Sequence, residues 1–318
     1  MSLSVISTPA AANDAARWAA LRARDARFDG SFYYAVRTTG VYCRPSCPSR
    51  LAQRSNVSFH ETREAAERAG FRPCKRCRPQ ELAASFEAAS AARDWERMRA
   101  ELNDSGSALL KGLLSNAHCQ QLARSYADAD RFRSRVVMSR HGFGCGEYQY
   151  FSYPLPPLVA RLRQACYAQL VPLANDWQER LGSATRYPRQ HARFLARCRA
   201  AGQRLPTPLL LRYQAGDYNC LHQDVYGECV FPLQLAVLLS QPGTDFDGGE
   251  FVLAEQRPRR QSRVEVAPLR QGDAVVFAVR ERPVRGARGT YRVQLRHGVS
   301  RVRHGERFTL GVIFHDAR

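Results

Sequence analysis

Four of the ten cysteines stand in two close pairs near the start of the chain. Three residues separate Cys43 from Cys47, two separate Cys74 from Cys77, and 26 residues lie between the pairs. Pairs at these spacings can place four sulfur atoms tetrahedrally around Zn²⁺. We therefore predict a zinc site made by these cysteines. Spacing alone leaves open whether the metal only stabilises the fold or also takes part in chemistry.

A second set of candidate ligands lies in the last third of the chain. His222 and Asp224 follow the apolar run PLLLRYQ, and His297 comes later. Two imidazoles and a carboxylate can form the facial triad that holds Fe(II) and leaves positions open for a cosubstrate and O₂. Arg307, in the run RFTLGVIF, can present a guanidinium fork to a carboxylate. The short motif alone also fits ordinary surface histidines, so a role without metal stays open.

Composition and charge narrow the class of protein. The chain has 318 residues, 44% hydrophobic and 24% charged, which is typical of globular proteins and of about two domains. Its net charge of +19 favours a polyanionic partner, nucleic acid first, although a bias toward arginine would give the same sum. We find neither a secretory signal nor an apolar run of membrane-spanning length, so we expect a cytoplasmic protein without a membrane partner.

Two helices are expected in the first 80 residues. Asn13 can cap a helix that runs through Trp18 and Leu21 to the turn at residues 29–30. A shorter helix, from about residue 61 to residue 69, is closed by Gly70.

The rest of the chain divides into a helical part and a strand-rich part. A run rich in Ala, Glu and Arg favours a helix over 81–102, and residues 107–202 look mainly helical. After Pro206, short β-rich runs alternate with turn residues, which is typical of a jelly roll. We therefore predict an α+β protein: a small zinc-binding α/β domain over 1–80, a helical linker over 81–106, and a double-stranded β-helix (jelly-roll) domain with a helical supporting layer over 107–318.

The first domain resembles a known family. The segment RWAALRARDARFDGSFYYAVRTTGVYCRPSCPSR, with NVSFHETREAAERAGFRPCKRCRP, is similar to the N-terminal zinc domain of the Ada alkylation-response proteins over about residues 17–79. The resemblance implies that all four cysteines bind zinc and that Cys43 takes a methyl group from a methylated DNA phosphate. A metal-bound sulfur stays deprotonated and nucleophilic, which suits this reaction. The candidates for contacts to the DNA backbone are Arg44, Arg72, Lys75, Arg76 and Arg78.

The strand-rich part resembles a second family. RYQAGDYNCLHQD, DFDGGEFVL, GDAVVF and RHGVSRVRHGERFTL are similar to the 2-oxoglutarate and Fe(II)-dependent dioxygenases, in particular the prolyl-hydroxylase-like branch, over about residues 206–316. The resemblance implies Fe(II) on His222, Asp224 and His297, with ascorbate as a candidate reductant. It also implies a 2-oxoglutarate pocket that uses Arg307, Tyr213 and Thr309. The arginine-rich R-x-N-x-x-x-R signature of AlkB-type DNA demethylases is missing from ERFTLGVIFHDAR.

These features lead to one main hypothesis and one alternative. The main hypothesis is a DNA alkylation-damage repair protein. It would join methyl acceptance by zinc-bound thiolate to oxidation of an alkylated nucleic acid, methylated or single-stranded. The alternative is a protein or small-molecule hydroxylase whose zinc domain only binds or senses damage. The arginine-rich segment 280–296 is expected to form a basic hairpin or loop beside the active-site mouth. The glycine-rich segment 141–146 is expected to be a loop, with a place near the substrate channel as one candidate.

Overall fold

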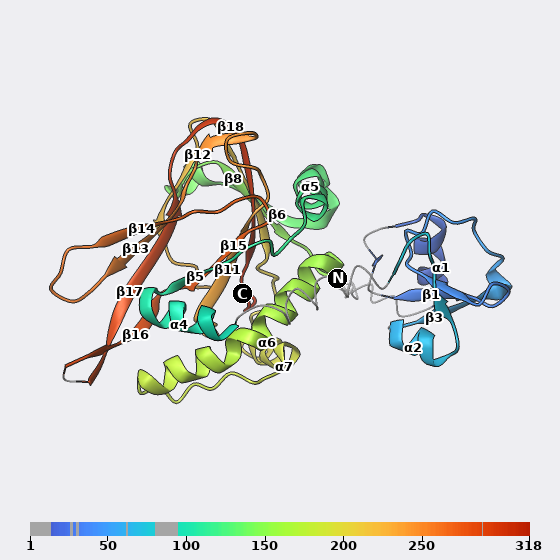
Figure 1. The fold of residues 1–318 in the computed structure, drawn as a ribbon, viewed down its shortest axis with the longest axis horizontal. Coiled ribbons are helices and arrows are strands. Elements are labelled where there is room, and N and C mark those ends of the chain that lie inside the picture. The colour runs from blue at the N-terminus through green and yellow to red at the C-terminus, as the bar shows by residue number, and fades with distance from the viewer. Residues whose placement is uncertain (1–13, 26–27, 30–31, 62, 80–94, 288) are drawn as a thin grey trace, which may run out of the picture. The chain divides into compact units, whose positions relative to one another are not determined.

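The computed structural model describes residues 14–318 except 26–27, 30–31, 62, 80–94 and 288. The chain forms two compact units, Met1–Ala92 with Tyr153–Arg161, and Arg93–Ser152 with Leu162–Arg318. We call them the cysteine domain and the jelly-roll domain, and Figure 1 shows the elements of each. No helix in the described ranges is long and apolar enough to cross a membrane.

The cysteine domain is built on a small sheet in the order β3-β1-β2-β4. Strands β1 to β3 pair antiparallel, and β4 joins β2 in parallel. Helix α1 agrees with the predicted first helix but ends earlier, and Asn13 lies outside the described residues. Gly70 follows α2 with φ of +86°, as its predicted closing role requires. The elements are α1 (Asp14–Arg22), β1 (Tyr33–Val36), β2 (Val41–Cys43), β3 (Val57–His60), α2 (Arg63–Arg68) and β4 (Arg72–Pro73).

The jelly-roll domain consists of two antiparallel sheets. The larger has the order β5-β15-β11-β18-β9-β8-β6, with β12 paired to β18. The smaller has the order β14-β13-β17-β10-β7, with β16 paired to β17. Apolar side chains from both sheets form the core between them, among them Phe251, Val275 and Phe277. The predicted α+β class with a jelly roll is confirmed.

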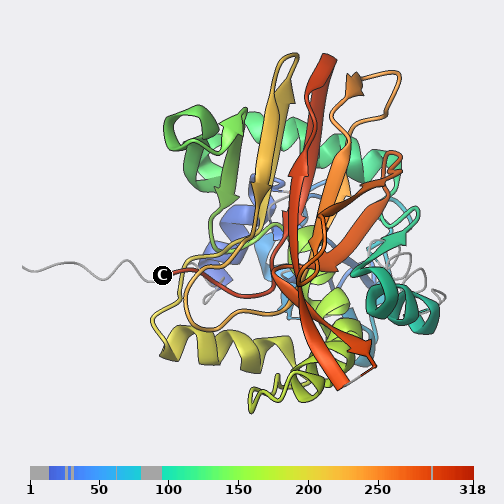
Figure 2. The ribbon, with the colours of Figure 1, turned by 90° about the vertical axis from the view of Figure 1, so that its left-hand side faces the viewer.

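The strands of this domain have the following bounds: β5 (Ser107–Leu110), β6 (Phe132–Val137), β7 (Gly144–Cys145), β8 (Glu147–Phe151), β9 (Leu209–Gln214), β10 (Tyr218–His222), β11 (Leu233–Leu238), β12 (Phe246–Gly248), β13 (Phe251–Gln256), β14 (Arg263–Ala267), β15 (Ala274–Ala278), β16 (Glu281–Gly286), β17 (Gly289–Val299) and β18 (Val302–Val312). Figure 2 shows the long strands β17 and β18 in red, and the helices α6 (Pro157–Arg180) and α7 (His191–Ala200) at one end of the sheets.

The prediction of a mainly helical region over 107–202 is wrong for its first half. Besides α5 (Asn116–Arg124), this half contributes β5, β6 and β8 to the larger sheet. The run SALL favours a helix by its composition, yet its pairing with β15 places it at a sheet edge. Tertiary pairing therefore overrides local propensity here.

The predicted linker helix is described only from Trp95 onward. Helix α4 (Trp95–Ser105) covers its last part, and residues 81–94 lie outside the described residues. Trp95, Met98 and Leu102 are buried along one side of α4. This helix therefore packs against the jelly-roll domain through an apolar stripe.

Candidate metal centres

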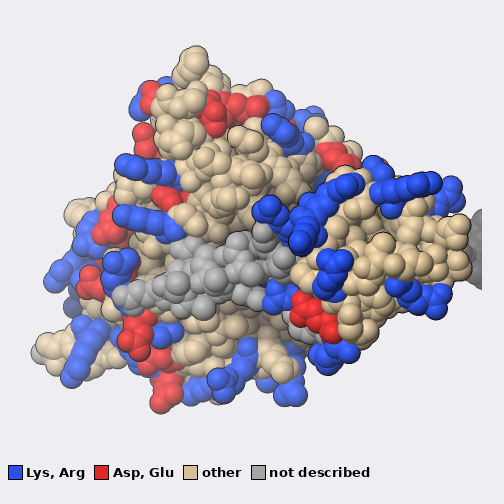
Figure 3. Space-filling model, turned by 45° about the vertical axis from the view of Figure 1, so that its right-hand side comes forward, with Lys and Arg blue, Asp and Glu red and all other residues tan. Residues whose placement is uncertain are grey.

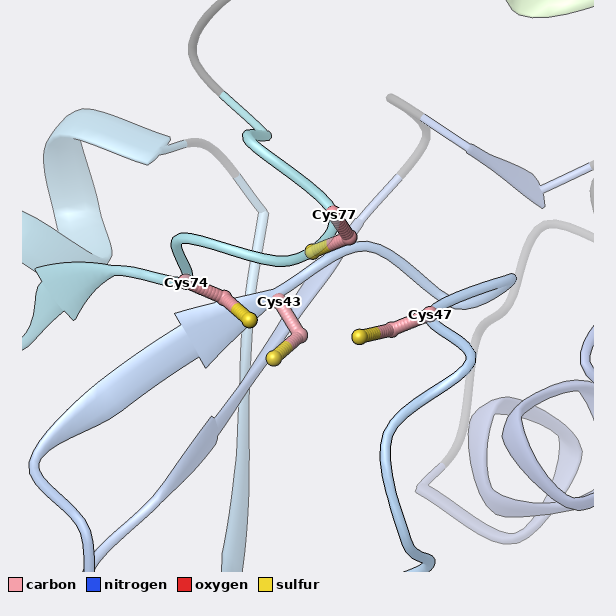
Figure 4. Close-up of side chains that lie close together, drawn as sticks. All are labelled: Cys43, Cys47, Cys74 and Cys77. Carbon is pink, nitrogen blue, oxygen red and sulfur yellow. The ribbon is translucent and has the colours of Figure 1, made fainter.

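The four predicted cysteines come together in the cysteine domain. Cys43 ends β2, Cys74 follows β4, and Cys47 and Cys77 lie in the loops after them. All four are buried, and their sulfur atoms lie within 4.8 Å of one another. Figure 4 shows the sulfurs pointing toward a common centre. Four buried thiols at this separation fit a tetrahedral zinc ion, which would hold them as thiolates.

Polar neighbours fix the loop that carries the first pair. The carboxylate of Asp29 accepts hydrogen bonds from the backbone N–H (2.9 Å) and the hydroxyl of Ser46. Arg44 lies with Nε 3.4 Å from the same carboxylate. On the other side, burial and then the neighbouring Cys43 and Cys47 thiolates raise the pKa of the Tyr34 phenol. The phenol thus stays protonated beside the sulfur cluster.

A basic groove of about 620 Å³ opens beside this cluster. Cys43 and Cys74 line it, whereas Cys47 and Cys77 are absent from its lining. The groove is bordered by Arg50, Arg72, Lys75 and Arg76, together with Thr38 and Thr39. Figure 3 shows that Lys and Arg side chains predominate over Asp and Glu on the visible face of the protein. An anionic ligand entering this groove would approach Cys43 between cationic side chains.

The five predicted DNA contacts therefore fall into two groups. Arg72, Lys75 and Arg76 line the groove and are exposed. Arg44 is ion-paired to Asp29, and Arg78 is exposed, but neither lines the groove. Sequence reasoning missed Arg50, Thr38 and Thr39, which lie at a greater sequence distance from the cysteines. The β1–β2 turn brings Thr38 and Thr39 to the groove, and the loop after Cys47 brings Arg50 there.

The His, Asp and His of the second set also meet. His222 ends β10, and His297 on β17 is its cross-strand partner in the antiparallel register. His222 Nε2 lies 3.6 Å from Asp224 Oδ1, and His297 Nε2 lies 3.3 Å from Asp224 Oδ2. Two ligands about 2.1 Å from one ion and at right angles lie about 3 Å apart, so this arrangement fits a shared metal.

Neighbouring groups orient His222 and Asp224. The Nδ1 of His222 lies 2.8 Å from the carbonyl of Cys220, which accepts its proton and leaves Nε2 free to bind a metal. Tyr226 donates to Asp224 Oδ1 at 2.7 Å, and Gln234 Nε2 donates to Oδ2 at 2.8 Å. Burial raises the pKa of Asp224, but the nearby His297, His222 and Tyr226 together lower it below its usual value. Burial lowers the pKa of His297, which favours the neutral imidazole that a metal requires.

The candidate iron ligands line a cavity of about 320 Å³ together with the predicted cosubstrate residues. Arg307 is buried, and its Nη1 donates to Thr309 Oγ1 at 2.6 Å. Its guanidinium lies over the ring of Tyr213, 5.5 Å from the centroid. Burial lowers the pKa of Arg307 to about 10, which still leaves it cationic at neutral pH. Among the described residues, no carboxylate lies within ion-pair distance of it, so the cavity offers an unpaired cation to an acidic ligand.

Two residues of this site were not predicted from the sequence. Gln234 is the polar member of the buried strand LQLAVL, and Tyr226 follows the His-x-Asp motif by two residues. Both hold Asp224, and both line the cavity. The one signal for Gln234 is an amide side chain inside a continuous apolar run, because a buried amide needs hydrogen-bond partners.

The predicted basic segment forms a hairpin of β16 and β17. Arg285, Arg292 and Arg296 are exposed on it, whereas Arg282 is buried and ion-paired to Glu255 at 2.6 Å. In the glycine-rich loop, Gly142 and Phe143 line the cavity.

Comparisons with known proteins agree with both halves of this description. A family model described as an oxygenase catalysing oxidative methylation of damaged DNA matches residues 146–317, and one described as the metal-binding domain of Ada matches residues 16–80. An uncharacterized protein of Mycobacterium tuberculosis is 50% identical over 167 residues, which are 52% of this chain and 72% of that protein.

Two further matches differ in extent and in identity. The bifunctional transcriptional activator/DNA repair enzyme Ada of Escherichia coli is 57% identical over 67 residues, which are 21% of this chain and 19% of Ada. Among solved structures, a prolyl-4-hydroxylase of Pseudomonas putida is 16% identical with a TM-score of 0.42, over 70% of this chain and 99% of that chain.

Proposed function

The chain belongs to the family of oxygenases whose model matches residues 146–317, with an Ada-type metal-binding domain before it, and from this premise we propose that it repairs alkylated DNA by two separate reactions. One reaction transfers a methyl group from a DNA phosphotriester to Cys43. The other oxidises an alkylated base in the jelly-roll cavity. The observation that carries the proposal is that each ligand cluster lines its own opening, a basic groove in one case and a largely apolar cavity in the other.

In the first reaction the sulfur of Cys43 attacks the methyl carbon of a neutral phosphotriester. The S–C bond forms as the C–O bond breaks, and the phosphate leaves as a diester anion. Zinc bound by the four cysteines keeps the sulfur deprotonated at neutral pH. The cationic side chains of Arg72, Lys75 and Arg76 would hold the flanking phosphates and favour the anion that leaves. Each chain would react once, because the thioether is stable.

In the second reaction the chain positions its reactants rather than supplying the oxidant. Fe(II) held by His222, Asp224 and His297 would, with 2-oxoglutarate and O₂, supply an oxidant able to hydroxylate a C–H bond, with succinate and CO₂ as co-products. Arg307 and Thr309 would bind the distal carboxylate of 2-oxoglutarate. Tyr226 and Gln234 hold Asp224 in place, and the Cys220 carbonyl fixes the orientation of the His222 ring.

The product of that reaction distinguishes repair from the alternative hydroxylase. Hydroxylation of an N-methyl group gives an unstable hydroxymethyl amine that releases formaldehyde and the unmodified base. Hydroxylation of an ordinary C–H bond in a protein or small molecule would instead leave a stable alcohol. The cavity walls are mostly apolar, with leucines and tyrosines beside the triad, which suits a flat base.

The test uses the full chain, loaded with zinc and Fe(II), and an oligonucleotide that carries both a methyl phosphotriester and an N-methylated base. We expect formaldehyde release that requires 2-oxoglutarate, and a single added methyl group on Cys43 by mass spectrometry. Formaldehyde without Cys43 methylation would reduce the cysteine domain to a binding module. Cys43 methylation without formaldehyde from any methylated base would reject DNA as the substrate of the oxygenase.

A further inference from the structure

A half-exposed aromatic ring stands at the rim of the oxygenase cavity. Phe143 is 47% exposed and lines the cavity that contains His222, Asp224 and His297. Its ring lies against that of His141, with 5.4 Å between centroids and 23° between planes. A phenyl ring this exposed beside a ligand cavity is a common mark of a binding surface.

The backbone holds this ring in place from both sides. The N–H of Phe143 donates to the carbonyl of Met138 at 3.2 Å, and its own carbonyl accepts from the N–H of Cys220 at 2.9 Å. The next residue, Gly144, has φ of +123°, and a Cβ there would lie 2.5 Å from the carbonyl of Tyr218. The loop is therefore closed tightly onto β10, which fixes the position of the Phe143 backbone at the edge of the cavity.

The neighbours of the ring suit an unpaired nucleic-acid strand. Leu221, 45% exposed, extends the apolar rim from β10, and it also lines the cavity. Arg140, on the same loop, is exposed and can meet a phosphate. Aromatic faces combined with cations are how proteins bind single strands, because every base has a π-face and every nucleotide a charge.

We propose that Phe143 and His141 form a stacking platform for the nucleobase adjacent to the one that is oxidised. This inference rests on the proposed function of the same cavity. A base that enters the cavity leaves the stack of its strand, and its neighbour then loses one stacking partner. The Phe143 ring replaces that partner and so lowers the cost of extracting the damaged base. Stacking does not depend on the hydrogen-bonding groups of a base, so the platform accepts any of the four bases as the neighbour.

The experiment is a double-mutant cycle between the protein and the strand. The dissociation constant of the full chain, loaded with Fe(II) and 2-oxoglutarate without O₂, is measured by fluorescence anisotropy. The strands are single-stranded oligonucleotides with one N-methylated base. Either both neighbouring bases are present, or the 5′ or the 3′ neighbour is replaced by an abasic site. Binding of the strand by the cysteine domain affects all the dissociation constants equally and therefore cancels when they are compared.

We expect loss of one neighbouring base to weaken binding of the native chain about 10-fold, a typical effect of one base–aromatic stack. The same loss should have no effect on Phe143→Ala, and Phe143→Leu, which keeps an apolar side chain without the ring, should behave like Phe143→Ala. Val264 on β14 is 57% exposed and does not line the cavity, so Val264→Ala should keep the native response.

Two outcomes would overturn the platform. Either neither neighbour shows coupling to Phe143, or Phe143→Ala weakens binding of all three strands equally, as loss of a cavity wall would do. Thermal unfolding of Phe143→Ala shows whether the fold is retained. The formaldehyde assay is scored separately. Formaldehyde without coupling rejects only the platform, whereas coupling without formaldehyde rejects only the oxidation of methylated DNA.

Discussion

The two ligand clusters of this protein are built in opposite ways. The four thiols come from one short segment of the cysteine domain, two at a time from neighbouring loops. The two histidines come from strands that are distant in sequence and paired in space, and Asp224 lies just after the first of these strands. All four thiols are buried, and two of them, Cys43 and Cys74, line the basic groove. In the triad only His297 is buried, and all three ligands line the cavity. A zinc ion would link the loops of the cysteine domain, whereas in the jelly-roll domain the paired strands hold the two histidines and a metal would add chemistry.

The largest effect should come from removing one zinc ligand. Cys77→Ser should lose zinc and unfold the cysteine domain, because structural zinc contributes roughly 10–16 kcal/mol in small zinc peptides. The jelly-roll domain should keep its own unfolding transition. Calorimetry with metal analysis measures both. Cys145→Ser, a partly buried cysteine of β7, is the matched control and should keep the zinc. Loss of both transitions in Cys77→Ser would contradict the independence of the two sites.

The second largest effect separates the two activities. His222→Ala should reduce formaldehyde release to background, since two ligands do not hold the iron in an active geometry. Methylation of Cys43 should continue at the native rate. Cys43→Ser should show the reverse pattern, provided that its zinc content is checked. A His222→Ala chain that still releases formaldehyde would remove the triad from the mechanism.

A smaller effect is expected at the cation of the oxygenase cavity. Arg307→Met should raise the KM for 2-oxoglutarate about 100-fold, equivalent to about 2.7 kcal/mol. Arg307→Lys should recover only part of the affinity, because it keeps the charge and loses the fork. The cofactor-free jelly-roll domain should not lose stability in Arg307→Met, since a buried guanidinium without an acidic partner is costly. An unchanged KM would place the carboxylate elsewhere.

The smallest effect concerns acid stability of the jelly-roll domain. Burial lowers the pKa of His191 and of His315 to about 3 each. In the unfolded chain these imidazoles take up protons near pH 6.5, whereas in the folded chain they stay neutral. Their contribution to the free energy of unfolding is therefore complete above pH 6.5 and decreases as the pH falls toward 3. Between these pH values, each imidazole should lower the free energy of unfolding by up to about 1.4 kcal/mol per pH unit.

Urea unfolding between pH 7 and pH 5 measures this slope. His315→Gln should reduce it, and replacement of the exposed His304 by Asn should leave it unchanged. A jelly-roll domain with the same stability at both pH values would show that the two imidazoles are protonated in the folded state.

Local features of the sequence predicted the parts of the protein that local sequence controls. The cysteine spacing predicted the thiol cluster, and apolar runs such as LQLAVL predicted strands of the jelly roll. The pairing of His222 with His297 could be expected once the second family resemblance was recognised. Strands at the edge of the larger sheet, such as β5 and β6, were not predicted, because their composition does not distinguish a strand from a helix.

Residues that act through the assembled fold were beyond the reach of the sequence. Gln234 approaches Asp224 only because β11 lies beneath the triad in the larger sheet, and Arg50 borders the groove only through the turn of its loop. Phe143 belongs to the glycine-rich loop that is a candidate for a place near the substrate channel, but nothing in the sequence marks its own side chain as exposed. Its exposure follows from the closure of its loop onto β10.

The cross-strand register of His222 and His297 restricts how the length of this gene can vary. Successive residues of a strand face opposite sides, so inserting one codon in β17 ahead of His297 would turn its imidazole outward, and a second insertion would restore its side but shift its level. The loop between Cys47 and β3 has no such parity, because a loop can lengthen at little entropic cost. Homologous chains should therefore differ in length in this loop and stay constant along β17.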